Sequence, residues 1–158
     1  MTSNHQFQIL CPDQGSDAWR RARLGRLTGS SAADMLATIK SGESAARRNL
    51  RTRLVLERLT NTPQDGDFVS PNMQWGMDTE PLALAAYREM TRINAQPVGF
   101  LGHLTLMAGC YPDAQVDNYQ GIVEIKCPKS ATHLSYLRGP VPDEYWKQCQ
   151  HNLWITGA

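Results

Sequence analysis

Residues 111–128 read YPDAQVDNYQGIVEIKCP, and the rest of the chain is organised around them. An apolar run enters Asp113, a polar turn follows, and a second apolar run carries Glu124 and Lys126 two positions apart. In a strand, residues i and i+2 share a face, so this carboxylate and this ammonium are predicted to lie side by side. Buried charges are costly unless they are paired or bound to an ion, and the polar turn can bring Asp113 alongside. The stretch therefore predicts a divalent-metal site, although Glu124 and Lys126 alone also fit an exposed, charged strand.

Length and composition are typical of one globular domain. The 158 residues can bury a sizeable core without a disulfide or a metal. The four cysteines show no C-x-x-C spacing, and the chain has no N-terminal apolar stretch and no run near the roughly 20 apolar residues of a membrane span. These features predict a single domain over residues 1–158 and a cytosolic protein with reduced thiols.

Charge is unevenly distributed along the chain, although the net charge is only +1. Residues 1–60 hold ten Lys and Arg against five Asp and Glu, whereas residues 61–158 hold six against ten. This distribution suits a protein that binds a polyanion with its basic N-terminal part and a cation with its acidic C-terminal part. The alternative is that the uneven distribution of charge arose by chance and has no functional meaning.

The basic part is expected to contain helices and a phosphate pocket. After an irregular lead-in over residues 1–15, a short helix is predicted to end at Gly25, and a second helix is predicted to begin at residues 30–31 and to run to about residue 39. The N-terminus of that second helix offers unpaired N–H groups beside hydroxyls and two arginines, Arg23 and Arg26. These groups predict a phosphate pocket, with a plain helix cap as the alternative.

The middle of the chain predicts two longer helices joined by a polar loop over residues 61–71. The first, over residues 43–59, is rich in arginine, which fits either a solvated face or a DNA-facing one. In the second, apolar residues from Met73 to Tyr87 form a stripe that contains Glu80. Pro81 predicts a kink or a restart there. Glu80 would need a partner in the core, either a buried arginine or an active-site metal or water.

The C-terminal part predicts a small sheet followed by two helices. Residues 94–100 and 104–110 are expected to be strands around a turn at Gly102-His103, and residues 121–127 a third strand. Helices are then predicted over residues 129–137 and from Asp143 onward. The last helix is expected to bury Trp146, Cys149 and Leu153. Its Gln148 would lie at the rim, where an amide can orient a water or a phosphate or be a satisfied structural group.

Several of these motifs follow one another in an order that resembles a known family. The matching pieces are Trp19 with RLGRLTGS at 23–30, GMDTE at 76–80, Gly99-Phe100, Pro112-Asp113, EIKCP at 124–128, and Tyr145–Gln148 with LWIT at 153–156. Asp followed by Glu-x-Lys is the pattern of the PD-(D/E)XK nucleases, and the chain resembles their lambda exonuclease or YqaJ-like viral recombinase group over about residues 16–156. The resemblance implies an α/β fold with a restriction-endonuclease-like core, in which a small mixed β-sheet is flanked by helices.

The resemblance also implies roles for individual residues. Asp113 and Glu124 would bind Mg²⁺ together with the backbone carbonyl of Ile125. Glu80 would assist the metal site directly or through water, Lys126 would orient or activate the attacking water, and Gln148 would lie beside the scissile phosphate. The residues that match those holding a DNA 5′-phosphate are Arg23, Thr28 and Ser30, with Arg26 next to them.

Phosphodiester hydrolysis explains why these residue types are wanted. The reaction needs charge neutralisation on the phosphate, a hydroxide-like nucleophile and a stabilised leaving oxygen, and two metal ions about 3.5 to 4 Å apart can supply all three. Mg²⁺ prefers oxygen ligands and keeps waters, so a few carboxylates and a carbonyl suffice, and Mn²⁺ can take its place. The four histidines show no metal-ligand spacing, which agrees with an oxygen-rich site.

The implied function is Mg²⁺-dependent exonuclease action on linear double-stranded DNA, 5′ to 3′, in phage-type homologous recombination. The family further implies a homo-oligomeric ring, a single-strand annealing protein as partner, no membrane, and a phage or prophage product in the cytoplasm of a bacterial host. The alternatives are an endonuclease or single-strand nuclease of the same fold, and a catalytically inactive DNA-binding relic.

Three positions depart from the family pattern. Ala114 stands where a glycine commonly follows the aspartate, and Tyr111 stands where serine is common, so the turn at the site is expected to be altered. The chain ends at Ala158, just after the last predicted helix, where relatives continue with further strands and a helix. A truncated or shortened nuclease domain is therefore expected.

Overall fold

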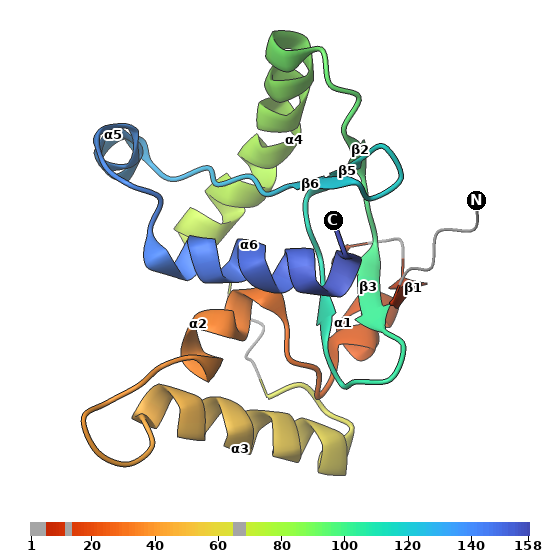
Figure 1. Ribbon diagram of the computed structural model, residues 1–158, viewed down its shortest axis with the longest axis vertical. Helices are drawn as coiled ribbons and strands as arrows, with labels where there is room; N and C mark the ends of the chain where they lie inside the picture. Colours follow the sequence, from red (N-terminus) through yellow and green to blue (C-terminus); the bar gives the residue numbers. More distant parts are fainter. Residues whose placement is uncertain (1–5, 12–13, 65–68) are drawn as a thin grey trace.

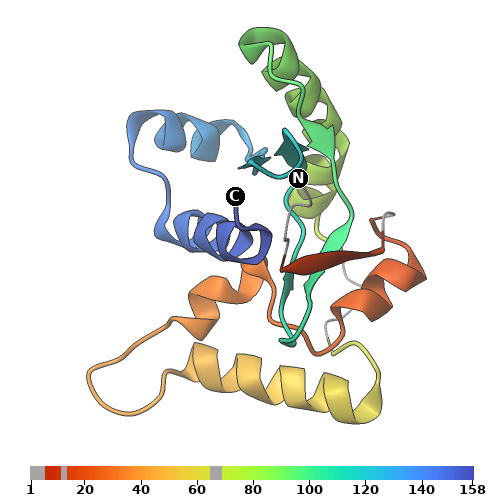
Figure 2. The ribbon, with the colours of Figure 1, turned by 45° about the vertical axis from the view of Figure 1, so that its right-hand side comes forward.

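The computed structural model describes residues 6–11, 14–64 and 69–158, and it confirms the α/β class. Its helices are α1 (Asp17–Arg23), the 3₁₀ turn η1 (Gly29–Ser31), α2 (Ala32–Met35), α3 (Ala45–Thr60), α4 (Pro71–Thr91), α5 (Ser130–Arg138) and α6 (Asp143–Thr156). Helix α6 crosses the middle of the molecule, with α4 and α5 on one side and α2 and α3 on the other (Figure 1, Figure 2). None of the helices described is long and apolar enough to cross a membrane.

The strands of the described residues form two antiparallel three-stranded sheets where one small mixed sheet was expected. The first sheet has the order β1-β3-β4, with β1 (Phe7–Cys11), β3 (Phe100–His103) and β4 (Gly109–Cys110). Strand β1 lies within the stretch predicted to be an irregular lead-in, so that prediction is wrong there. A parallel bridge between Leu27 and Ala108 ties the segment after α1 to this sheet.

The turn before β4 lies later than the sequence predicts. Gly102 and His103 belong to β3, and the chain turns over residues 104–108 instead. A Cβ at Gly102 would lie 2.4 Å from Cδ1 of Leu10, so the glycine makes room for that side chain of β1. The Nδ1 atom of His103 accepts hydrogen bonds from the backbone N–H groups of Thr105 and Leu106, each at 3.2 Å, and so stabilises the turn.

The second sheet brings the two predicted metal ligands together. It has the order β2-β5-β6, with β2 (Gln96–Pro97), β5 (Ala114–Val116) and β6 (Gly121–Val123). Ala114 pairs with Val123, so Asp113 immediately before β5 and Glu124 immediately after β6 lie at the same end of one hairpin. The backbone N–H of Asp113 donates to the carbonyl of Val123 at 3.1 Å. Strand β6 is thus shorter than the strand predicted over residues 121–127.

The helices mostly follow the prediction, with one clear difference in length. Ser16 caps α1 by accepting a hydrogen bond from the backbone N–H of Trp19 at 3.1 Å. The second helix, expected to reach residue 39, ends at Met35. Helix α4 runs through Pro81 without a restart. The loop predicted over residues 61–71 lies partly outside the described residues.

Two helices bury faces that differ from the predicted ones. In α4, Met73 and Met77 are 56% and 47% exposed. Leu84 is the buried residue of the predicted stripe. In α6, Trp146 is exposed, whereas the buried residues are His151, Asn152, Ile155 and Thr156. Ile155 packs into a core cluster with Phe7, Leu101 and Cys110 of the first sheet and with Ala108, which directly precedes β4. The apolar pattern of α6 therefore gave the wrong face because polar residues fill much of the buried one.

Candidate active site

A pocket of about 190 Å³ lies between α1, the segment after it, the end of the β5–β6 hairpin and α6. Its lining residues are Trp19, Arg23, Thr28, Gly29, Ser30, Phe100, Tyr111, Asp113, Glu124, Lys126, Gln148 and Asn152. The list includes both the predicted metal and catalytic residues and the predicted phosphate-binding residues. Glu80, Arg26 and Ile125 are predicted site residues that do not line the pocket itself.

Asp113 is held against the segment that carries Glu124. Its Oδ2 atom accepts a hydrogen bond from the backbone N–H of Ile125. Burial raises the pKa of Asp113 above its usual value, although the bond from Ile125 and the charge of Lys126 oppose the shift. The carboxyl group is therefore fixed in position and would be stabilised as an anion by any added positive charge.

Glu124 accepts hydrogen bonds from three side chains, and its own side chain is only 7% exposed. Its Oε1 atom accepts from Nζ of Lys126 at 2.6 Å and from the side-chain amide of Gln148. Its Oε2 atom accepts from Nδ2 of Asn152 at 2.9 Å. Burial still raises the pKa of Glu124 to about 7, because desolvation of the carboxylate outweighs the attraction of Lys126, and the charge of Asp113 adds to the rise.

Glu80 lies within electrostatic range of this pair, although it does not line the pocket. It projects from α4, is half-buried, and has a raised pKa, caused first by burial and then by the charge of Asp113, while Lys126 opposes the rise. Three carboxyl groups therefore oppose one another's ionisation around one lysine. Such a cluster favours the binding of a cation.

The residues present fit a hard divalent cation. Over the described residues, no group of three or more His, Cys, Asp or Glu side chains is close enough to hold a metal ion. Two carboxylates with backbone or amide oxygens and waters are nevertheless a sufficient ligand set for Mg²⁺, which keeps several waters. The buried Oδ1 atom of Asn152 has no hydrogen-bond partner among the described residues, and it lies in the same pocket lining as the carboxylates.

Two thiols share the electrostatic environment of these carboxylates. Burial is the first cause that raises the pKa of Cys127, and the charges of Glu80 and Asp113 add to it. The pKa of Cys149 rises through burial first and then through the charge of Glu124. Both thiols are therefore held in the protonated form at neutral pH.

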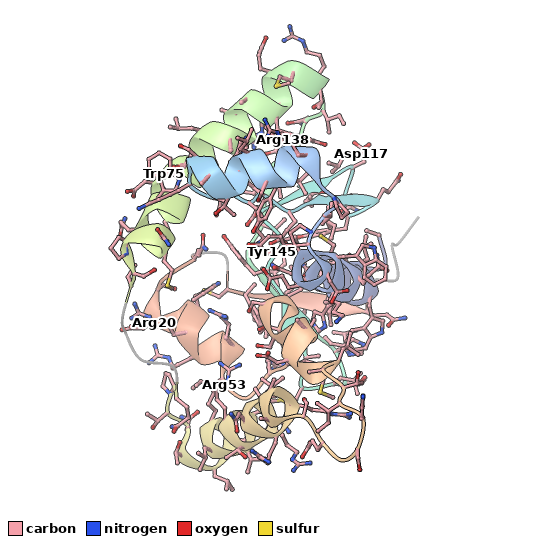
Figure 3. The ribbon with its side chains drawn as sticks, turned by 90° about the vertical axis from the view of Figure 1, so that its left-hand side faces the viewer. Arg20, Arg53, Trp75, Asp117, Arg138 and Tyr145 are labelled. Atoms are coloured by element: carbon pink, nitrogen blue, oxygen red, sulfur yellow. The ribbon has the colours of Figure 1, made fainter. Side chains whose placement is uncertain are left out.

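Lys126 has a second contact besides its ion pair with Glu124. Its Nζ atom lies 5.2 Å from the centroid of the Tyr145 ring, within the range of a cation–π interaction. The hydroxyl of Tyr145 lies 3.4 Å from that of Tyr136, and Figure 3 shows Tyr145 in the space between α5 and α6. The bond to Tyr136 is the main cause that raises the pKa of Tyr145 to about 12, so its hydroxyl stays neutral beside the lysine.

The phosphate-binding candidates form the other wall of the pocket. The guanidinium carbon of Arg23 lies 4.1 Å from the ring centroid of Trp19, and Trp19 contacts Tyr111 edge to face at 5.9 Å. The hydroxyls of Thr28 and Ser30 are 3.2 Å apart. A cation and two hydroxyls thus converge within one pocket, as recognition of a phosphate requires.

Arg26 has a structural role in this arrangement. Its Nε atom donates to the carbonyl of Ala22 at 3.1 Å, and Nη1 donates to the carbonyl of Leu106 at 3.4 Å. Burial is the main cause that lowers the pKa of Arg26, and the charge of Arg58 contributes. The structure therefore places Arg26 between α1 and the turn before β4, and a DNA contact from it stays a prediction.

Sequence reasoning missed Asn152 as a site residue. Asn152 is 1% exposed and joins the two walls, since it donates to Glu124 while its Oδ1 lies against Gly29. A Cβ added at Gly29 would lie 2.3 Å from that oxygen, so a larger residue there would displace the Asn152 side chain. The four-residue spacing between Gln148 and Asn152 on one helix face is the signal that could have identified it.

Comparisons with known proteins agree with the resemblance found in the sequence. The family model described as the YqaJ-like viral recombinase domain matches residues 18–158. The crystal structure of the alkaline exonuclease LHK-Exo from Laribacter hongkongensis matches with a TM-score of 0.79 and 35% identity, over 90% of this chain and 69% of that one. LHK-Exo in complex with dAMP matches with a TM-score of 0.78, at the same identity and coverage. A search of curated proteins gave no match.

Proposed function

Since the chain belongs to the YqaJ-like viral recombinase family, we propose that it is a deoxyribonuclease that digests linear double-stranded DNA from its 5′ ends in phage-type recombination. The family and the exonuclease neighbour support an exonuclease. The observation that carries the proposal is the single pocket that holds Asp113, Glu124 and Lys126 on one wall and Arg23 with two hydroxyls on the other. Cleavage chemistry and recognition of a terminal phosphate would thus occur in the same pocket.

Asp113 and Glu124 would hold Mg²⁺ together with the carbonyl of Ile125, and Glu80 would act on the site directly or through water. Bound Mg²⁺, or Mn²⁺ in its place, would neutralise phosphate charge and favour a hydroxide nucleophile, and a second ion would stabilise the leaving oxygen. Glu124 would have to share its oxygens between the ion and the three donors that now bond it. These donors fix the direction in which its carboxylate can face a ligand.

Lys126 and Gln148 donate to the same oxygen of Glu124, so their polar ends meet at one point of the pocket. From there both can donate to a scissile phosphate or to the attacking water. Positioning of this kind lowers the barrier because the reacting groups do not have to be ordered during the reaction.

Arg23, Thr28 and Ser30 would hold the 5′-phosphate of the strand being digested. The Trp19 ring fixes the plane of the Arg23 guanidinium, which suits two parallel hydrogen bonds to a phosphate. A site for the terminal phosphate beside the metal ligands would set the 5′ to 3′ direction and release mononucleotides. The binding of dAMP, a mononucleotide, by LHK-Exo supports this proposal.

The proposal extends to assembly and cellular context on the strength of the family alone. The protein would form a ring-shaped homo-oligomer around its duplex, leave 3′ single strands for an annealing protein, and act in the cytoplasm of a bacterial host as a phage or prophage product. Size measurement by light scattering tests the ring. A monomer that digests DNA processively would contradict it.

Digestion of a 5′-labelled linear duplex in Mg²⁺ tests the function. Release of mononucleotides is expected, and Lys126→Ala and Asp113→Ala should abolish it. Lys147→Ala is the matched control, because Lys147 pairs with Asp143 and is not among the residues that line the pocket. Activity that persists in Lys126→Ala or Asp113→Ala would rule out the proposed site.

Substrate comparison separates the alternatives. Cleavage of closed circular duplex would indicate an endonuclease, and preferential digestion of single strands would indicate a single-strand nuclease. Duplex binding without any Mg²⁺-dependent cleavage would indicate a DNA-binding relic. A 5′-hydroxyl end digested as fast as a 5′-phosphate end would remove the role proposed for Arg23.

A further inference from the structure

The segment over residues 25–31, here called the phosphate loop, is held at both ends by one helix. It contains Thr28, Gly29 and Ser30, which line the pocket. Helix α3 lies alongside it and contacts it through Arg53, Glu57 and Arg58. These three residues do not line the pocket, and the arginine-rich sequence of α3 alone indicates no link to it.

At the first end of the phosphate loop, α3 bonds both polar groups of Gly25. Oε2 of Glu57 accepts from its N–H at 2.8 Å, and Nε of Arg58 donates to its carbonyl at 2.8 Å. Gly25 has φ +64°, and a Cβ there would lie 2.4 Å from Cγ of Arg58. Glu57 is only 6% exposed. A buried carboxylate on a helix is expensive, so its bond to the loop accounts for its position.

At the second end, Nη2 of Arg53 donates to Oγ of Ser31 at 3.0 Å. Ser31 is buried, and Arg53 lies on the side of α3 that faces the loop (Figure 3). Arg53 and Glu57 are four residues apart, so they project from the same face of the helix. One face of α3 therefore reaches both ends of the phosphate loop.

The middle of the loop is fixed by the first sheet. The N–H of Leu27 donates to the carbonyl of Met107 at 2.9 Å, and the carbonyl of Leu27 accepts from the N–H of Gly109 at 2.9 Å. With both ends and the middle held, the two hydroxyls at Thr28 and Ser30 are presented in one geometry. Such preorganisation raises affinity because little ordering is left to occur on binding.

We propose that Glu57, Arg58 and Arg53 are positioning residues for recognition of the DNA 5′-phosphate. This inference rests on the proposed function, since it takes the phosphate loop as the site of that group. Glu57 acts through the Gly25 peptide and Arg53 through Ser31, and none of the three touches the DNA end. Loss of either contact leaves the metal ligands in place but loosens the hydroxyls that bind the phosphate.

The test is the ratio of digestion rates on two linear duplexes that differ only in a 5′-phosphate or a 5′-hydroxyl end. Glu57→Ala is expected to lower this ratio about fivefold, the effect of about one hydrogen bond, with little change in the rate on the hydroxyl end. Glu57→Gln should retain the wild-type ratio, because an amide oxygen can accept the same N–H. Glu89→Ala is the matched control, since Glu89 is 73% exposed and pairs with Arg92 on α4.

Arg53→Ala and Ser31→Ala test the contact at the second end of the phosphate loop, and they test the positioning role if Glu57→Ala does not fold. Both should lower the ratio in the same direction, and their combination should cost no more than either alone. An unchanged ratio in the folded variants would overturn the positioning role and leave the proposed function standing. An equal loss of rate on the 5′-phosphate and the 5′-hydroxyl duplex would have the same meaning. A wild-type protein without preference for the 5′-phosphate would overturn both proposals.

Discussion

Asn152 donates a hydrogen bond from Nδ2 to Oε2 of Glu124 at 2.9 Å, while its Oδ1 lies against Gly29. The carboxylate proposed as a metal ligand and the loop proposed to bind the 5′-phosphate are thus joined by one buried side chain. Groups that orient a metal ligand in this way tune its affinity for the ion, and their loss costs about 10- to 100-fold.

Asn152→Leu should therefore weaken Mg²⁺ binding and raise the Mg²⁺ concentration that activity requires. Leucine has a similar shape but leaves Oε2 of Glu124 without this donor, so the Mg²⁺ concentration for half-maximal activity is expected to rise about tenfold. A Mg²⁺ titration of the digestion rate measures the change. Gln150→Ala, an exposed amide on the same helix, is the control, and an unchanged half-maximal concentration in Asn152→Leu would contradict the prediction.

Glu124→Gln should stabilise the metal-free protein at alkaline pH. Burial raises the pKa of Glu124 from 4.5 to about 7, so folding favours its protonated form. The stability that depends on this proton is fully present below pH 4.5 and is lost as the pH rises through 7. In EDTA at pH 8, the free energy of unfolding of Glu124→Gln should exceed that of the wild type by at most about 3 kcal/mol. Thermal unfolding at pH 4.5 and pH 8 checks this, and an equal difference at both pH values would contradict it.

Mg²⁺ should bind more tightly as the pH rises towards 8. Protons compete with the ion for Glu124, whose pKa is raised to about 7, and for Asp113, whose pKa is raised as well. Below pH 7 the affinity is expected to fall about tenfold per pH unit for one competing proton. Calorimetric titration with Mg²⁺ between pH 5.5 and 8.5 measures the slope. A flat profile in the wild type would show that neither proton opposes binding.

Tyr145→Leu should reduce activity more than Tyr145→Phe. The ring lies 5.2 Å from Nζ of Lys126, and phenylalanine keeps that contact while losing the bond to Tyr136. A cation–π contact at a half-exposed site contributes about 0.5 to 1 kcal/mol, so the rate is expected to fall about two- to fivefold in Tyr145→Leu. Single-turnover digestion compares the two variants. Equal rates would show that the ring does not position Lys126.

The sequence predicted that Asp113 and Glu124 lie side by side because their spacing is local. Asp113 and Glu124 flank one hairpin, and the pairing of Ala114 with Val123 brings them together, as the polar turn between them suggested. The capped start of α1 at Ser16 was predictable for the same reason, since its hydrogen bond spans three residues. Short-range chemistry can be recognised before any fold is known.

Long-range packing accounts for what the sequence could not predict. Gly102 indicated a turn, but its absent side chain makes room for Leu10 of another strand. Asn152 shares a helix face with Gln148, but the sequence does not show that it bonds Glu124, which lies 28 positions away in the chain. Glu57 looked like one more charge on a solvated helix, and its bond to Gly25, 32 positions away in the chain, could not be foreseen. In each case the partner is brought near by the tertiary fold.

The two thiols near the carboxylates have a consequence for metal selectivity. Cys127 and Cys149 are held protonated by burial and by the negative charge around them, so they offer no thiolate to a soft ion. An ion at the proposed site would then be held by oxygen donors, the ligands that suit Mg²⁺ and Mn²⁺, without the thiolate that a soft ion such as Cd²⁺ prefers. A bound divalent cation would cancel the charge that protects these thiols, and faster alkylation of cysteine in Mg²⁺ would report its arrival.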